Sequence, residues 1–266
     1  MKKNLNKEAY AIVTGASKGL GYAYCEELLK LEYNIIAVAR NTDSLQELQK
    51  KYSNLKIETW NLDLSDLNNS YKLFEKSKNL DIEIVINNAG YGVWGYFHET
   101  DLEKEMNMID LNIKSLHILT KKFTQYFIQK NKGRVINIAS MGSFTPGPVF
   151  SSYYASKAYV LSFGIAINTE LKKLKSKARV ITICPGALKT DFWNRSSNEQ
   201  RAKIRNNSKT ISSSVYAKNS LKKALKAKKK NYIIFGTFNK LAKKLTKIMP
   251  EYVVLNSVYN YQRKTK

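Results

Sequence analysis

The stretch AYAIVTGASKGLG, residues 9–21, joins a short apolar run to a glycine-rich turn. The apolar run predicts a buried strand, and a helical pattern begins within the turn. Glycines at 15, 19 and 21 let the backbone turn tightly and approach a pyrophosphate, which the free N–H groups and dipole of the following helix favour. The spacing departs from the G-x-G-x-x-G fingerprint, so a generic glycine turn remains an alternative for this motif alone.

Apolar strands and amphipathic helices alternate along the rest of the chain. Runs such as IIAVA (35–39) and RVINIA (134–139) are apolar without strict alternation, which is typical of parallel strands covered on both faces. We expect strands near 9–14, 34–39, 55–60, 82–87, 133–139, 178–184 and 231–235, and helices near 18–31, 42–52, 66–79, 100–130, 151–175 and 214–229. The pattern predicts an α/β fold with a doubly wound, parallel, seven-stranded Rossmann-type sheet between helix layers.

The length of 266 residues allows one sizeable core without a second domain. We expect residues 1–236 to form this domain, with a polar substrate loop at 189–214, and residues 237–266 to form a basic, helical C-terminal extension.

A tyrosine and a lysine stand four positions apart in SSYYASKAYV, residues 151–160. On a helix Tyr153 and Lys157 share a face, so the ammonium can favour the phenolate. The pair therefore predicts a proton donor tuned towards neutral pH. The alternative is a surface Tyr and Lys on an amphipathic helix.

Several motifs in order closely resemble the classical short-chain dehydrogenase/reductase family, over about residues 8 to 236. They are the glycine loop, NNAG at 87–90, Ser140, the Tyr153 and Lys157 pair, and Pro185-Gly186. The segment PGPVFSSYYASKAYVLSF (146–163) is similar to the bacterial DltE-like branch. The resemblance implies an oxidoreductase that moves hydride between a nicotinamide and a carbonyl or alcohol, and the branch implies little about its substrate.

The resemblance also implies catalytic roles. Tyr153 protonates the carbonyl oxygen, and Ser140, thirteen positions upstream, orients and polarises it. Lys157 bonds the nicotinamide ribose and lowers the pKa of Tyr153. Asn112 kinks the long helix and holds a proton-relay water, although a helix-interior Asn pointing to solvent is the alternative.

The end of the second strand bears on the choice of cofactor. Enzymes that prefer NAD usually place an acid there, but this chain has Ala39 followed by Arg40. Lys18 in the glycine loop adds a second cation, and the Arg40 fork suits phosphate oxygens. We therefore expect NADP(H) to be preferred over NAD(H), with ordinary surface charge as the alternative.

Further cofactor contacts follow from the resemblance. Asp63 would reach the adenine amino group, although it could instead cap the next helix. Thr190 would lie beside the nicotinamide carboxamide. The full expected set is Gly15, Ser17, Lys18, Gly19, Leu20, Gly21, Arg40, Asp63, Asn87, Ala89, Gly90, Tyr153, Lys157, Pro185, Gly186 and Thr190.

The net charge of +24 is concentrated near the C-terminus. From Lys189 to Lys266 there are 20 Lys and Arg against 3 Asp and Glu. Such a balance attracts acidic partners, or marks only a solvated basic surface. Because no recognition motif accompanies it, we expect no nucleic-acid partner.

The other bulk features are less specific. Cys25 and Cys184 are expected to be buried free thiols, and with only His98 and His117 besides, we expect no metal site. Because there is no apolar stretch for a signal peptide or a membrane span, we expect a cytoplasmic protein.

Three functions compete. The leading expectation is an NADPH-dependent carbonyl reductase or alcohol dehydrogenase acting on a small molecule, with Phe144, Phe150, Phe192 and Trp193 suggesting an apolar pocket. The alternatives are a 3-oxoacyl thioester reductase whose basic flank docks an acidic carrier, and a catalytically silent NADP-binding regulator. The family resemblance also implies a homodimer or homotetramer through the helices near 100–130 and 151–175.

The segment after Gly236 places Phe238, Leu241, Leu245 and Ile248 at helical spacing, with lysines opposite, until Pro250 interrupts or restarts the helix. Three fates are open for this apolar face. It packs over the protein's own substrate pocket, contacts a second subunit, or lies weakly on an anionic membrane.

Overall fold

A single parallel sheet forms the centre of the computed structural model, which describes residues 8–189, 192, 196 and 211–263. Its seven strands lie in the order β3-β2-β1-β4-β5-β6-β9, and every pairing is parallel. The strands are β1 (Tyr10–Thr14), β2 (Asn34–Ala39), β3 (Ile57–Asn61), β4 (Ile82–Asn87), β5 (Arg134–Ile138), β6 (Arg179–Ile183) and β9 (Tyr232–Ile233). The predicted doubly wound Rossmann-type fold is confirmed.

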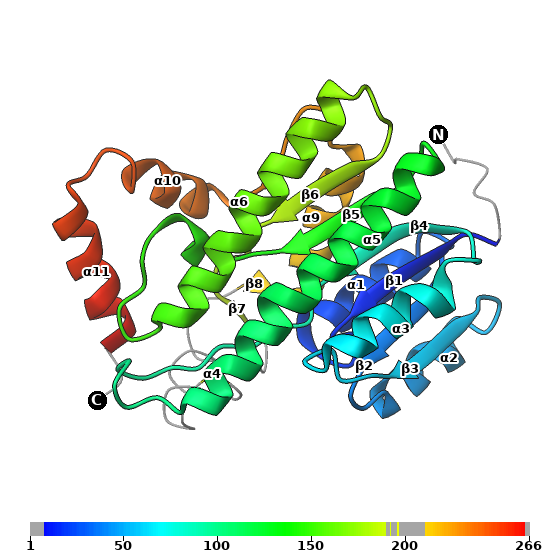
Figure 1. Ribbon diagram of the computed structural model, residues 1–266, viewed down its shortest axis with the longest axis horizontal. Coiled ribbons are helices and arrows are strands. Elements are labelled where there is room, and N and C mark those ends of the chain that lie inside the picture. The colour runs from blue at the N-terminus through cyan, green and yellow to red at the C-terminus, as the bar shows by residue number, and fades with distance from the viewer. Residues whose placement is uncertain (1–7, 190–191, 193–195, 197–210, 264–266) are drawn as a thin grey trace.

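Helices cover both faces of the sheet (Figure 1). One face packs against α1 (Gly19–Leu29), α2 (Gln46–Lys51), which follows a short 3-10 turn, η1 (Asp43–Leu45), and α9 (Ser213–Lys226). The other packs against α3 (Leu67–Ser77), α5 (Leu116–Gln129) and α6 (Ser151–Lys173). Two separate apolar clusters result, and this explains why the strands β1, β2 and β4 are buried along their whole length.

The helix layer formed by α1, α2 and α9 is held together by contacts between residues that are distant in sequence. The Tyr24 hydroxyl of α1 lies 2.9 Å from the Ser220 hydroxyl of α9, and both side chains are fully buried. Cys25 and Cys184 are buried free thiols, as expected from the sequence. Burial raises the pKa of the Cys184 thiol to about 12 and raises the pKa of Cys25 as well.

The predicted helix at 100–130 is interrupted by a π-helical segment. It consists of α4 (Leu102–Ile109), the π-helical η2 (Asp110–Ser115) and α5. Asn112 lies in the π-helical segment, wholly buried. Its Oδ1 accepts from the Tyr91 N–H at 3.2 Å and its Nδ2 donates to the Tyr91 carbonyl at 2.8 Å, so the alternative of a solvent-pointing Asn is wrong.

The C-terminal third contains two short strands that the sequence did not indicate and the helical extension that it did. Short strands β7 (Leu188–Lys189) and β8 (Ile211–Ser212) pair in parallel at the two ends of the expected substrate loop. After β9, the chain forms α10 (Thr237–Leu245) and α11 (Glu251–Arg263), so Pro250 precedes a new helix. In Figure 1 both helices lie at one margin of the molecule.

None of the helices in the described part of the chain is long and apolar enough to cross a bilayer. The same described residues hold no cluster of three or more metal-ligating side chains. The expected compartment stays a prediction.

Candidate active site

A cavity of about 730 Å³ opens at the carboxyl ends of the parallel strands. It spans the point where the chain order reverses between β1 and β4, which is where open α/β sheets bind ligands. The expected residues that line it are Gly15, Ser17, Lys18, Gly19, Leu20, Arg40, Asp63, Ala89, Gly90, Ser140, Tyr153, Lys157, Pro185 and Gly186. Of the others, Thr190 lies outside the described residues.

The glycine loop is built so that backbone approaches backbone. Gly15 has φ +64°, and a Cβ there would meet the Ala89 Cα at 2.9 Å. A Cβ on Gly21 would meet the Gly15 carbonyl oxygen at 2.1 Å, so Gly21 serves the packing of α1 onto the loop rather than the cavity lining. Lys18 stands at the N-cap of α1, and because its ammonium has no acceptor atom, it leaves the first N–H groups of the helix without a cap from this side chain. The loop therefore fits the pyrophosphate of a nicotinamide dinucleotide.

The NNAG turn fixes the floor of this loop through Asn88. Its Nδ2 donates to the carbonyls of Thr14 at 2.9 Å and Gly15 at 3.2 Å. The Thr14 hydroxyl accepts in turn from the N–H groups of Asn88 and Ala89, both at 3.0 Å. Asn87 instead points into the core, where its Nδ2 donates to Asn137 at 2.9 Å. The structure does not bring the Asn87 side chain to the cavity.

Tyr153 and Lys157 project from the first turns of α6, and both are buried. The Lys157 Nζ donates to the Ile138 carbonyl at 3.0 Å and lies 5.8 Å from the centroid of the Tyr153 ring. Ser140 caps the 3-10 turn η3 (Met141–Phe144) by accepting from the Gly142 N–H at 3.1 Å, and its hydroxyl acts on Tyr153 to lower the pKa of that phenol. The structure thus brings together Ser140, Tyr153 and Lys157, the three residues for which the sequence predicted a part in proton transfer to the substrate.

The proton affinities differ from the sequence-based expectation. Burial raises the pKa of Tyr153 and outweighs the opposing hydrogen bond from Ser140. Burial also lowers the pKa of Lys157 to about 8. The expectation of a phenol tuned towards neutral pH by Lys157 is therefore wrong for the ligand-free chain, where the phenol is protonated at neutral pH.

Asn112 lies behind the cavity wall rather than on it. Its Nδ2 is 3.2 Å from the Ser156 hydroxyl. A Cβ on Gly90 would meet the Asn112 Oδ1 at 2.7 Å and the Lys157 Nζ at 3.4 Å, so these three residues are neighbours. Through its bonds to the Tyr91 backbone, Asn112 fixes the chain next to Gly90. It therefore supports the part of the cavity wall that lies beside Lys157.

Two cations and one acid surround the end of the cavity that lies beyond β2 and β3. Lys18 and Arg40 are exposed, and Ala39 before Arg40 is buried. The Asp63 Oδ1 accepts from the Ser65 N–H at 3.0 Å and the Ser65 hydroxyl at 2.7 Å. The alternative that Asp63 caps the next helix is wrong, because Asp66 caps α3 by accepting from the Asn68 N–H.

Aromatic rings line the opposite end. The Tyr153 ring stacks on Phe150 at 4.5 Å between centroids and lies 5.3 Å from Phe192. Phe144, expected here, instead packs against Tyr232 at 5.7 Å, and Trp193 lies outside the described residues. This end is apolar, as the sequence suggested, and two of the four expected aromatic residues, Phe150 and Phe192, line it.

The extension contributes to the same end, through residues that the sequence did not single out. Tyr261 and Gln262 of α11 line the cavity. The Gln262 Nε2 donates to the Tyr154 hydroxyl at 2.7 Å, and the Gln262 side chain is 1% exposed. Tyr154 in turn packs against the backbone at Gly142 and Gly147. No local pattern could have revealed a contact between residues 108 positions apart.

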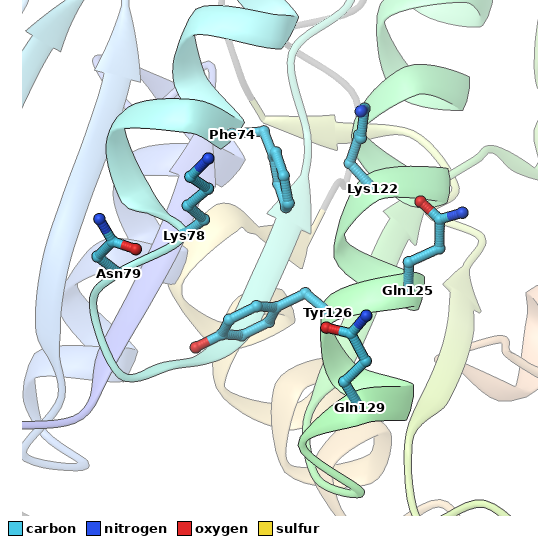
Figure 2. Close-up of a pocket in the computed structure, with 7 residues that line it drawn as sticks. All are labelled: Phe74, Lys78, Asn79, Lys122, Gln125, Tyr126 and Gln129. Atoms are coloured by element: carbon cyan, nitrogen blue, oxygen red, sulfur yellow. The ribbon is translucent and has the colours of Figure 1, made fainter.

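Figure 2 shows a second hollow, of about 500 Å³, between α3 and α5. The residues that line it are Phe74, Lys78, Asn79, Lys122, Gln125, Tyr126 and Gln129. The Tyr126 hydroxyl is already engaged, since it donates to the Leu80 carbonyl at 2.8 Å. This hollow holds none of the residues expected to carry chemistry.

The sequence matches the family described as short chain dehydrogenase over residues 9–201. An uncharacterized oxidoreductase of Schizosaccharomyces pombe is 34% identical over 195 residues, which are 72% of this chain and 64% of that protein. A very-long-chain 3-oxoacyl-CoA reductase of Neurospora crassa is 31% identical over 65% of this chain and 54% of its own length. The chain thus spans roughly half to two thirds of these curated relatives. The DltE-like branch finds no support among them.

Solved structures share the fold. A short-chain dehydrogenase of Sphingobium yanoikuyae in complex with NADPH has a TM-score of 0.73 at 26% identity, covering 81% of this chain and 84% of its own. A serine dehydrogenase complexed with NADP+ has a TM-score of 0.75 at 25% identity, covering 84% and 93%. A 7β-hydroxysteroid dehydrogenase reaches 0.80 at 21% identity over 98% of this chain and 99% of its own.

Proposed function

The chain belongs to the short-chain dehydrogenase family, and on that premise we propose that it is an NADPH-dependent oxidoreductase acting on a carbonyl or alcohol group. The observation that carries the proposal is the convergence of Ser140, Tyr153 and Lys157 in a cavity that continues to the glycine loop. Reduction of carbonyl compounds by the purified protein, followed as NADPH oxidation, tests it.

The proposed chemistry divides among three side chains. A bound nicotinamide cofactor supplies or accepts the hydride. The Ser140 hydroxyl donates to the carbonyl oxygen and stabilises the charge that develops there. The Tyr153 hydroxyl transfers its proton to the same oxygen as a general acid. Lys157, held by the Ile138 carbonyl, provides a cation beside this proton and a donor for the cofactor ribose.

The raised pKa of Tyr153 supports the direction of reduction at neutral pH. A general acid must be protonated when it acts, and a buried phenol meets this condition. Alcohol oxidation needs the phenolate instead. At neutral pH the phenol is thus in the protonated form that carbonyl reduction requires.

The preference for NADPH over NADH is a further part of the proposal, and it is supported by Lys18, Arg40 and the small Ala39. Each exposed cation contributes about 1 kcal/mol or less, so either single substitution by Ala changes the NADPH/NADH ratio of kcat/KM by less than about five-fold. The Lys18→Ala/Arg40→Ala double variant is expected to lower the ratio about 10- to 30-fold.

Steady-state kinetics with both cofactors measure this ratio. The control is Lys50→Ala/Lys72→Ala, which removes two exposed lysines outside the cavity and is expected to leave the ratio unchanged. Equal use of both cofactors by the wild type would contradict the proposal.

A 3-oxoacyl thioester is the second candidate substrate class. Two observations favour it: the aromatic end of the cavity, and the relatives in Neurospora crassa and Laccaria bicolor named as very-long-chain 3-oxoacyl-CoA reductases. A parallel assay with 3-oxoacyl-CoA and ketosteroids separates the classes, because only a thioester reductase turns over the first. The silent regulator is less well supported, since Ser140, Tyr153 and Lys157 are all in place.

Gln262 is proposed to contact the substrate, because it lines the aromatic end with its amide held by Tyr154. Gln262→Leu is expected to raise KM for the carbonyl substrate about five-fold through loss of one net hydrogen bond, with the NADPH Kd unchanged. Initial-rate kinetics and NADPH fluorescence titration provide the two numbers. Asn260→Leu, at an exposed site on α11, is the matched control. A KM that moves equally in both variants argues against a substrate contact.

Self-association through α5 and α6 is also proposed, in the form of a homodimer or homotetramer. His117 and Phe163 stack across these helices at 4.5 Å, which supplies a partly exposed aromatic face. Sedimentation velocity measures the assembly.

A further inference from the structure

The helix α10 faces the protein with its polar side. Its Asn239 lies against the turn at Gly186, where an added Cβ would meet the Asn239 Nδ2 at 2.8 Å. The Lys243 Nζ lies 5.9 Å from the ring centroids of both Phe144 and Tyr232. Asn239, Ala242, Lys243 and Thr246 are the less exposed positions of this segment. They share one side of the helix.

The apolar side of α10 consequently faces outward. Phe238 is 80% exposed, Leu241 55%, Leu245 44%, and Ile248 just beyond the helix 79%. All nine residues of α10 remain at least partly exposed. Of the three fates left open, packing of this face over the protein's own pocket is therefore wrong for α10, although the next helix does reach the pocket. A gathered apolar surface of this kind marks an interaction site.

Lysines border the exposed apolar face. Lys240, Lys244 and Lys247 are exposed, and within the described part of the chain none has an acidic side chain at ion-pair distance. The surrounding C-terminal region contributes most of the net charge of +24. The occupant of this surface must therefore be apolar where it meets Phe238 and Ile248, and anionic around them.

A second copy of the chain meets the first condition and not the second. Bringing two such faces together would set lysines of one copy against those of the other, and like charges in contact cost several kcal/mol. An anionic bilayer meets both conditions, because an amphipathic helix lies in the interface with its apolar face in the acyl boundary and its lysines at the headgroup phosphates.

We propose that α10 docks the protein on an anionic membrane surface, with Phe238, Leu241, Leu245 and Ile248 inserted. No spanning segment is needed, since the helix lies in the plane of the interface. The connection to the cavity is short: Asn239 contacts the turn at Gly186, and α11 carries Gln262 to the cavity. Because α11 follows α10 and lines the aromatic end of the cavity, docking through α10 would bring that end near the bilayer. This arrangement suits a substrate that partitions into lipid.

Co-sedimentation of the full chain with vesicles tests the proposal. One set contains phosphatidylglycerol and phosphatidylcholine, and the other phosphatidylcholine alone. We expect binding to the anionic set only, weakening as salt rises from 50 to about 300 mM because the lysines are screened. Lys240→Gln/Lys244→Gln/Lys247→Gln is expected to lower the partition coefficient about 100-fold, at roughly 1 kcal/mol per lysine.

Two comparisons make the result specific. Lys50→Gln/Lys56→Gln/Lys72→Gln removes the same charge at three exposed sites, in α2, directly before β3 and in α3. This variant is expected to bind vesicles almost like the wild type. Phe238→Gln/Leu241→Gln/Ile248→Gln keeps every lysine but is expected to abolish binding. NADPH binding by each variant shows that it is folded.

Three outcomes would overturn the proposal. The first is the absence of anionic-vesicle binding by the wild type at low salt. The second is equal loss of binding in the two lysine variants, which indicates only bulk charge. The third is a wild-type oligomer that dissociates in the Phe238→Gln/Leu241→Gln/Ile248→Gln variant without any vesicle binding, which would assign the face to a second copy.

Discussion

Tyr153→Phe is expected to lower kcat for carbonyl reduction by about 10² to 10⁴-fold while NADPH binding stays near that of the wild type. The substitution removes the hydroxyl that donates the proton and keeps the ring. The Tyr153 ring packs against Phe150 and Phe192, and a phenylalanine ring would keep both contacts. A loss of activity in the variant would therefore not come from a cavity in the site. Single-turnover rates and an NADPH titration measure the two effects separately.

The neighbouring Tyr154 offers a matched control. Tyr154→Phe removes a hydroxyl from the same helix turn, one that bonds Gln262 rather than Ser140. Less than about ten-fold loss is expected, in line with one hydrogen bond. If Tyr153→Phe retained activity within ten-fold of the wild type, the assignment of Tyr153 as general acid would be rejected.

Lys157→Met is expected to weaken NADPH binding and to lower kcat together, since one cation serves both. Burial lowers the Lys157 pKa to about 8, so the ammonium is lost as pH rises through that value in the ligand-free chain. The affinity of the wild type for NADPH should therefore fall above about pH 8, and this fall should add to any decrease in affinity caused by the titration of other groups. The variant should bind weakly, without this step. A step of equal size in both proteins would assign the titration to another residue.

The same pKa separates loss of function from loss of folding. The folded-state pKa of Lys157 lies below its ordinary value of 10.5, so between the two values the unfolded chain binds more protons. The contribution of this group to the free energy of unfolding therefore rises with pH across that window. At neutral pH the buried ammonium destabilises the folded chain. Lys157→Met should melt no lower than the wild type at pH 7 although its kcat is lowered, as calorimetry would show.

The positions of the strands were largely predictable because the apolar runs that form them are local in the sequence. Apolar runs such as residues 35–39 are buried on both faces, and their ends fall within a few residues of the structure. The glycine loop was predictable for a related reason, since only glycine fits where Gly15 approaches Ala89. The candidate residues at the strand ends then came together through sheet topology alone.

Features that depend on distant residues escaped the sequence. The π-helical segment contains Asn112, whose side chain bonds the backbone of Tyr91, 21 positions away. The pKa of Tyr153 depends on burial, which spacing does not report. Periodicity identified the apolar side of α10 but not which way it faces, because Asn239 and Lys243 decide that through contacts with other elements.

The bond between Tyr24 and Ser220 bears on how the protein is made. Ribosomes synthesise the chain from its N-terminus, so β1 and α1 emerge long before α9, which packs beside α1 on the same face of the sheet. Until α9 has left the exit tunnel, a nascent chain displays the surface around Tyr24 to the cellular milieu. Such surfaces recruit chaperones and promote aggregation. The helix layer around α1 is completed only once residues 213–226 have been synthesised, so slow translation ahead of residue 213 would prolong the interval in which the surface around Tyr24 is exposed.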